Sequence, residues 1–333
     1  MKRVRFAPSP TGSLHIGNAL SAVANRALGD WMLVRIDDTD ATRNLPGGEE
    51  AILRDLEWLG VKWDEGPVRQ SSRQERYREA AAELGPRFDG ITLLRDDGTA
   101  TFHLASVVDD GDFAITHVVR GNDHRPNEDL HRRLHDALGT PAPEYVHHGL
   151  ILGEDGKKLS KRAPGATVES LREAGLPPSA VRAYLEELDL PRGDVHYDLS
   201  RIRRLAVEAI AAMPDDELAA WADVPVEVVP AMRGARDLGE AQEAARTVLE
   251  PEPAILDESS RPTLERFREL RTGANGGLSH ASAKELLREL KAVGGDLRAL
   301  RLALTGKERG PELASILAAL DREETLRRVD AAL

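Results

Sequence analysis

A segment near the start of the chain combines residues suited to binding an anion. Val4 and Phe6 are typical of a strand, and the prolines that follow end it because proline offers no donor to a ladder. From His15 the apolar residues recur at helical spacing until Gly29. Backbone N–H groups and the helix dipole at such a helix start favour an anion such as phosphate. His15 and Asn18 stand on the first turn, where their side chains can donate hydrogen bonds to it.

A second segment concentrates positive charge. Lys157, Lys158, Lys161 and Arg162 follow the apolar run 150–152 on a short loop. Alone, such a loop is typical of a solvated basic turn. Beside a phosphate site, its ammonium groups would stabilise charge that develops on the phosphates.

Two acidic clusters have ordinary explanations. Asp37, Asp38 and Asp40 directly follow an apolar run, and a turn with an aspartate cap explains this pattern better than a metal site does. The cluster 109–112 is interpreted as a solvated turn. His147 and His148 resemble a zinc pair, but no cysteine accompanies them, and we favour a structural role.

The elements that must position these residues alternate between strand and helix. Residues 31–36 form a predicted strand, and 49–59 and 73–84 are predicted helices. Strands separated by helices imply a doubly wound, mostly parallel α/β sheet of Rossmann-like type, in which ligands bind beyond the carboxyl ends of the strands. The loop at His15 and the carboxylate of Asp37 would meet there.

The next region has shorter runs of alternating residues. They are separated by turns and predict strands over 91–94, 100–108 and 113–120. A helix is predicted over 129–138, and a strand over 145–152 leads into the lysine-rich loop.

After Pro191 the predicted segments are helical, with proline and glycine between them. We expect an α/β domain over 1–194, followed by all-α domains over 195–255 and 256–333. The last of these carries more cations than anions, unlike the chain as a whole.

Composition excludes several classes of protein. The chain has 333 residues, a formal net charge of −12 and no cysteine. The charge argues against indiscriminate nucleic-acid binding by the whole surface. The lack of cysteine removes disulfides, thiol nucleophiles and cysteine-ligated zinc. Apolar runs are too short to cross a membrane. We expect a cytoplasmic protein with neither zinc nor a membrane partner.

Taken together and in this order, the segment around His15 and the loop 158–162 resemble the signature pair of class I aminoacyl-tRNA synthetases. The first segment resembles glutamyl-tRNA synthetase in particular. Further matches to that family extend along nearly the whole chain, at 35–40, 63–67, 70–71, 107–110, 115–121 and 302–306. The resemblance implies a Rossmann-type catalytic domain with a mobile lysine loop, a helical stem-contact domain and a helical anticodon-binding domain.

The resemblance also implies a reaction and its residues. Glutamate would be activated by ATP, with Mg²⁺, to an adenylate and transferred to tRNA(Glu), with tRNA(Gln) as a further candidate, by a monomeric enzyme. Catalytic roles would fall to His15, Lys158 and Lys161. The expected ATP site comprises Pro8, Thr11, Gly12, His15, Gly17, Asn18, Leu159, Ser160 and Lys161. The expected glutamate site comprises Arg5, Ala7, Ser9, Asp37, Phe102, Ser106 and Arg120.

The glutamate pocket departs from the family at three positions. Asp37, Phe102 and Ser106 stand where the family has glutamate, tyrosine and asparagine. Arg5 and Arg120, matched to the side-chain and backbone carboxylates of the amino acid, remain. A charge at the end of a buried strand, as at Arg120, is costly unless paired, which favours a carboxylate ligand.

A second departure concerns tRNA. The residues 84–91 close the place where the family carries an insertion that grips the acceptor end. Two alternatives therefore stay open: an enzyme that glutamylates a queuosine base of tRNA(Asp), and a tRNA-independent or non-catalytic synthetase paralogue. The queuosine enzymes usually end near the catalytic domain and bind zinc through cysteine, unlike this chain.

Overall fold

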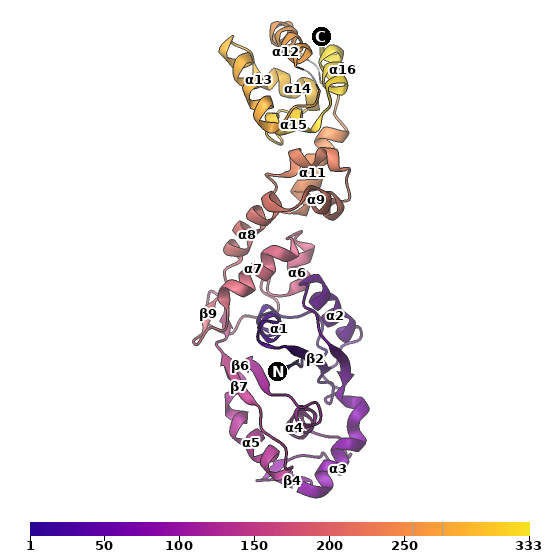
Figure 1. The fold of residues 1–333 in the computed structure, drawn as a ribbon, viewed down its shortest axis with the longest axis vertical. Helices are drawn as coiled ribbons and strands as arrows, with labels where there is room; N and C mark the ends of the chain where they lie inside the picture. Colours follow the sequence, from indigo (N-terminus) through magenta and orange to yellow (C-terminus); the bar gives the residue numbers. More distant parts are fainter. Residues whose placement is uncertain (255, 275) are drawn as a thin grey trace. The chain divides into compact units, whose positions relative to one another are not determined.

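The computed structural model describes residues 1–254, 256–274 and 276–333. The chain divides into two compact units, both drawn in Figure 1. No helix of the described residues is long and apolar enough to span a membrane. The sheet unit comprises 1–173 and 181–202, and the helical unit comprises 174–180 and 203–333.

A parallel sheet forms the centre of the sheet unit. Within the described residues it has five strands in the order β3–β2–β1–β6–β7. The chain builds outward from β1 through β2 to β3, then crosses to the other side of β1. This confirms the predicted doubly wound α/β fold and places its switch point between β1 and β6. The strands are β1 (Arg3–Phe6), β2 (Trp31–Ile36), β3 (Glu65–Arg69), β6 (His117–Gly121) and β7 (Glu144–His148).

Helices connect and cover these strands (Figure 1). The predicted helices near 16–28, 49–59, 73–84 and 129–138 are confirmed to within a residue or two at their ends. The helices are α1 (Ile16–Leu28), α2 (Gly48–Trp58), α3 (Gln74–Leu84), α4 (Phe102–Asp112), α5 (Glu128–Ala137), α6 (Val168–Glu173) and α7 (Pro178–Leu188).

Side chains of β1 and β2 alternate between the two faces of the sheet. Val4 faces α1, because a Cβ added to Gly29, which caps that helix, would lie only 2.4 Å from Val4 Cγ2. Arg5 and Arg35 point to the opposite face, where both reach carboxylates of α4. One face is therefore apolar, whereas buried charges meet at the other.

The helix α4 corrects two predictions: the strand over 100–108 and the solvated turn at 109–112. Every residue from 104 to 110 is buried, so the helix lacks the one-sided apolar stripe by which a surface helix is recognised. Asp109 is 0 % and Asp110 3 % exposed. These carboxylates enter the interior because cations from neighbouring elements pair with them.

A tight hairpin stands where the family insertion was expected to be missing. It consists of β4 (Arg87–Phe88) and β5 (Ile91–Thr92), which pair antiparallel. The two residues between them, Asp89 at φ 49° and Gly90 at φ 80°, adopt the left-handed conformation of a two-residue turn. The segment therefore closes on itself.

The predicted strand over 145–152 is two elements rather than one. β7 ends at His148, and β8 (Ile151–Leu152) pairs in parallel with β9 (Val195–His196), outside the main sheet. A Cβ at Gly149 would lie 1.9 Å from the carbonyl oxygen of Gly193. The strand breaks where the chain passes this distant segment, a contact that only glycine allows.

The helical unit confirms the predicted all-α C-terminal region. Within the described residues, no strand follows β9. Its core is one apolar cluster that includes Phe267, Leu290, Leu300 and Val329. The helices of this region are α8 (Leu199–Ala212), α9 (Asp215–Ala222), α10 (Val229–Met232), α11 (Leu238–Leu249), α12 (Arg261–Gly273), α13 (His280–Ala292), α14 (Leu297–Thr305), α15 (Leu313–Ala319) and α16 (Arg322–Ala332).

Asp109 joins α3 to α4 by several hydrogen bonds. The Tyr77 hydroxyl lies 2.9 Å from both carboxylate oxygens. Arg73 Nε donates to Asp109 at 2.8 Å, and Gln70 Nε2 donates at 3.0 Å. Because Tyr77 and Asp109 are both buried, water is not available to replace a donor that is lost.

The substitution Tyr77→Phe removes one of these donors without changing the ring. We expect the free energy of unfolding of the sheet unit to fall by about 1–2 kcal/mol. Urea denaturation followed by tryptophan fluorescence measures this, in a Trp221→Phe background that leaves the tryptophans of the sheet unit. The control Ser72→Ala removes an exposed hydroxyl and should change the value by less than about 0.5 kcal/mol. Equal effects of the two substitutions would contradict the role of Asp109.

Candidate active site

A cleft of about 620 Å³ opens at the carboxyl ends of the central strands. Its walls come from the loop after β1, the end of β2, the start of α4, the end of β6 and the lysine-rich loop. This is the edge at which a doubly wound sheet binds its ligands. The predicted site residues that line the cleft are Arg5, Ala7, Pro8, Ser9, Thr11, His15, Gly17, Asn18, Asp37, Phe102, Arg120 and Lys158.

Several predicted site residues do not line the cleft. Lys161 is close by, because its Nζ donates to the carbonyl oxygen of Thr11 at 3.0 Å and lies 3.1 Å from Thr11 Oγ1. Ser106 is buried below the cleft, and its Oγ lies 3.5 Å from Arg35 Nη2. The remaining predicted residues outside the lining are Gly12, Leu159 and Ser160.

Asp55 on α2 holds the loop that precedes α1. Its Oδ2 accepts hydrogen bonds from Ser13 Oγ at 2.6 Å and from the backbone N–H of Leu14 at 2.8 Å. Arg172 pairs with the other oxygen at 3.2 Å. Sequence reasoning missed Asp55, although a carboxylate on the apolar face of a predicted helix was a usable signal.

His15 caps α1 and presents a hydrogen-bond donor. Its Nδ1 accepts from the backbone N–H of Gly17 at 3.1 Å, so Nε2 carries the proton of the neutral ring. That Nε2 is buried and has no partner among the described residues. Burial, and then the positive charge of Lys161, lowers the pKa of His15 to about 4. A neutral donor therefore meets any anion bound at this helix start.

Arg120 offers an unpaired positive charge. Its Nε donates to His147 Nε2 at 3.2 Å, and its guanidinium lies 4.6 Å from the ring centre of Tyr145. Nη2 is buried without a partner in the part of the chain that the structure describes. Burial, and then the charge of Arg5, lowers the pKa of Arg120 to about 10. The group stays protonated at neutral pH, so a carboxylate ligand would supply both the acceptor and the counter-charge.

Asp37 is held from below by Arg35. Arg35 Nε donates to Asp37 Oδ1 at 2.7 Å and Nη2 donates to Oδ2 at 3.2 Å. Burial raises the pKa of Asp37, and the Arg35 guanidinium limits that rise. Arg35 is 0 % exposed on β2. Sequence analysis did not give it a role at the site, although a charge inside the apolar run 31–36 was a signal.

The lysine-rich loop supplies two further cations. Lys158 Nζ pairs at 2.7 Å with Oδ2 of Asp123, which lies in the short 3-10 helix Asn122–Asn127 that follows β6. Lys161 binds oxygens of the loop after β1, including the Ser13 carbonyl at 3.4 Å. Both ammonium groups are thus bound beside the cleft by protein oxygens. The phosphate oxygens of a ligand could take the place of these oxygens.

An aromatic cluster borders the cleft around Phe102. Its ring centroid lies 5.5, 5.9 and 5.7 Å from those of His103, His124 and His131. His103 Nδ1 lies 3.1 Å from His131 Nε2. His131 is 2 % exposed, and burial, then the charge of Arg120, lowers its pKa to about 3.

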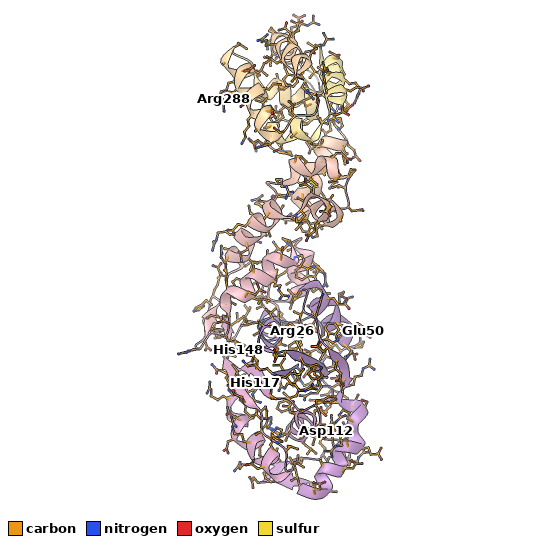
Figure 2. All side chains as sticks on the ribbon, viewed as in Figure 1. Arg26, Glu50, Asp112, His117, His148 and Arg288 are labelled. Carbon is orange, nitrogen blue, oxygen red and sulfur yellow. The ribbon has the colours of Figure 1, made fainter. Side chains whose placement is uncertain are left out.

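His148, labelled in Figure 2, ends β7 at the cleft. Its Nδ1–H donates to the Gly149 carbonyl at 2.9 Å, and Nε2 accepts from the Ser21 hydroxyl at 2.7 Å. Both ring nitrogens therefore make protein hydrogen bonds. Across residues 1–254, 256–274 and 276–333, no three histidine or carboxylate side chains gather as metal ligands.

His131 should make stability depend on pH. The unfolded chain takes up a proton on this histidine below about pH 6.5, whereas the folded chain does not until about pH 3. Stability therefore falls as pH decreases between these values, by about 1.4 kcal/mol per pH unit from this group. His131→Gln should remove that contribution. Urea denaturation between pH 6 and pH 4 measures the slope, and an identical slope in the variant would show that His131 is not held neutral.

Two family models match the chain. The catalytic domain of class I tRNA synthetases (E and Q) matches residues 1–87 and 85–197, and the anticodon binding domain matches residues 238–333. The two pieces of the first match meet at the β4–β5 hairpin.

Curated relatives match along nearly their whole length. Glutamate–tRNA ligase 1 of Rubrobacter xylanophilus is 34% identical over 432 aligned positions, which cover 99% of this chain and 97% of the relative. Glutamate–tRNA ligase of Akkermansia muciniphila is 31% identical, covering 98% of each chain. The crystal structure of a glutamate tRNA ligase from Elizabethkingia meningosepticum in complex with its amino acid shares the fold, with a TM-score of 0.73, 22% identity and 99% of each chain covered. The chain belongs to the glutamate–tRNA ligase family of class I tRNA synthetases.

Proposed function

We propose that the chain is an ATP-dependent glutamate–tRNA ligase that uses the cleft of the sheet unit. The observation that carries the proposal is the meeting, in one cleft, of an anion-binding helix start and two buried guanidinium groups. The helix start suits the phosphates of ATP, and the guanidinium groups suit a dicarboxylic amino acid. Membership of the family supports the same assignment.

The amino acid site is built from both sides of the sheet's switch point. Arg5 and Arg120 bind the two carboxylates of glutamate. Asp37 lines the cleft and faces the ammonium, directly or through a water, since its side chain is short. Ala7 and Ser9 line the cleft on the loop after β1, and the ring of Phe102 forms part of the cleft wall.

The ATP site follows the start of α1. His15, Gly17 and Asn18 hold the phosphates, because they line the cleft at the positive end of the helix dipole and His15 Nε2 offers a donor without a partner among the described residues. Lys158 and Lys161 stabilise charge on the leaving pyrophosphate, and Mg²⁺ would accompany the phosphates. The loop residues that shape this site are Pro8, Thr11, Gly12, Leu159 and Ser160.

The reaction requires no covalent bond to the protein. An oxygen of the glutamate α-carboxylate attacks the α-phosphate of ATP, and the bond to pyrophosphate breaks as the adenylate forms. A ribose hydroxyl of the tRNA end then attacks the activated carbonyl, and AMP leaves with the bonding electrons. The side chains act by positioning the reactants and by stabilising charge.

The helical region reads the tRNA in this proposal. Residues 195–255 contact its stem and 256–333 its anticodon; the match to the anticodon binding domain over 238–333 supports the second assignment and begins within the first segment. Exposed cations such as Arg288 on α13 (Figure 2) and Lys291 suit contacts to phosphate. Arg271 does not, since it is buried and donates to the Ala274 and Gly276 carbonyls. The enzyme acts as a monomer on tRNA(Glu), and tRNA(Gln) is the second substrate to test.

Charging of tRNA with labelled glutamate tests the proposed function. Purified tRNA(Glu), tRNA(Gln) and tRNA(Asp) are offered separately, with ATP and Mg²⁺. We expect ATP-dependent label on tRNA(Glu) that the other amino acids do not displace. Label on tRNA(Asp) would support the queuosine-modifying alternative. ATP-dependent consumption of glutamate without labelled tRNA would support the tRNA-independent paralogue.

Lys161→Ala tests the lysine loop. Charge that develops on the pyrophosphate makes this cation more valuable in the transition state than in bound ATP. Single-turnover charging should slow by about 10²-fold, whereas the calorimetric affinity for ATP should change much less. The control Lys157→Ala removes the exposed neighbouring lysine, whose ammonium, unlike that of Lys161, makes no hydrogen bond to the loop after β1 among the described residues, and should charge tRNA at the rate of the unaltered chain. Normal turnover of the Lys161 variant would remove the loop from the mechanism.

A further inference from the structure

We propose that Arg35 and Asp110 are the positioning residues of the amino acid site, which hold Asp37 and Arg5 through one continuous chain of charge pairs. The inference rests on the proposed function, because it deepens the account of the same site. Neither residue lines the cleft, whereas both residues that they hold do so.

Asp110 links the guanidinium groups of Arg35 and Arg5. A single oxygen, Oδ1, accepts from Arg35 Nη1 at 3.0 Å and from Arg5 Nε at 3.2 Å. Arg35 then holds Asp37 with both oxygens bound, at 2.7 and 3.2 Å. The order of the chain is therefore Arg5–Asp110–Arg35–Asp37, and it runs beneath the cleft from the strand β1 to the end of β2.

Burial makes this series of charge pairs rigid. Arg35 is 0 % and Asp110 3 % exposed, so water does not screen the pairs or offer alternative partners. Burial opposes ionisation of Asp110, but the charges of Arg5 and Arg35 outweigh it and keep the pKa of that carboxyl below its usual range. The planar guanidinium of Arg35 orients both carboxylates at once, which a lysine ammonium would not do.

Asp110 also allows two like charges to share the cleft. Arg5 and Arg120 both line it, and each disfavours the charge of the other. Asp110 places a carboxylate directly on Arg5, whereas the buried Nη2 of Arg120 has no partner among the described residues. Two guanidinium groups therefore face the two carboxylates of the ligand: that of Arg5 is held in place by Asp110, and that of Arg120 keeps a donor for the ligand.

The adjacent aspartate has a different task. Asp109 accepts from Tyr77, Arg73 and Gln70 on α3 and its approach, and it lies 3.5 Å from Arg35. Its hydrogen bonds hold the scaffold, whereas those of Asp110 lead to a cleft residue. Of these two adjacent residues, Asp109 therefore serves the stability of the fold and Asp110 the recognition of the amino acid.

Asp110→Asn tests the proposal with a side chain of the same shape. With tRNA(Glu), the KM for glutamate should rise by about 10- to 100-fold, because a charge-assisted hydrogen bond to Arg5 is lost. The KM for ATP should stay unchanged, and kcat should fall much less than the affinity for glutamate. Arg35→Lys should give the same pattern, since it keeps the charge and loses the bidentate geometry.

Asp112→Asn is the matched control. Asp112 ends the same helix (Figure 2), but it pairs with Arg73 and Arg76 at the surface. This variant should keep the glutamate KM of the unaltered chain. In the double variant Arg35→Lys/Asp110→Asn, the KM for glutamate should rise no further than in the worse single variant. Either substitution alone already interrupts the series of charge pairs.

Three results would overturn the inference while leaving the proposed function intact. They are an unchanged glutamate KM in Asp110→Asn, additive losses in the double variant, or a parallel rise of both KM values with a lowered unfolding midpoint. Calorimetric binding of glutamate to the folded fraction separates weak recognition from loss of fold. Failure of the unaltered chain to charge tRNA would instead contradict the proposed function.

Discussion

The pairing of the buried Arg35 guanidinium with carboxylates is the interaction on which the sheet unit depends. An uncompensated charge in the interior costs several kcal/mol, so α4 must pack where it brings Asp109 and Asp110 to β2. Asp109 then accepts a hydrogen bond from Tyr77 on α3, and Asp110 accepts one from Arg5 on β1. One charge cluster therefore joins the two halves of the fold and lies directly beneath the cleft.

Above this cluster the cleft keeps positive charge and neutral donors for its ligands. Arg120 and Lys158 carry charge, whereas His15 stays neutral because it is buried near Lys161. A second cation at His15 would add repulsion without improving its hydrogen bond. A triphosphate and a dicarboxylic amino acid both complement such a surface, so one cleft would serve both anions of the proposed reaction.

The β4–β5 hairpin bears on how the tRNA acceptor end would reach the cleft in the proposed function. The alignment with the Rubrobacter relative spans 432 positions against 333 residues here, and the catalytic match consists of two pieces that overlap at 85–87. A two-residue turn cannot fold into a separate domain. Contacts with the tRNA acceptor end then fall to the rim of the cleft in the proposed mechanism.

Local patterns in the sequence by themselves determined the first strand, the loop at His15 and the helix α1, because caps, prolines and helical spacing act over a few residues. They did not predict α4, because residues on all of its sides are buried and no helical period of apolar residues is visible. Nor did they predict the end of β7 before Gly149, which depends on the contact with Gly193. The roles of Arg35 and Asp110 likewise arose only in the tertiary structure. A buried charge is defined by its partners, and folding brings those partners from distant parts of the chain.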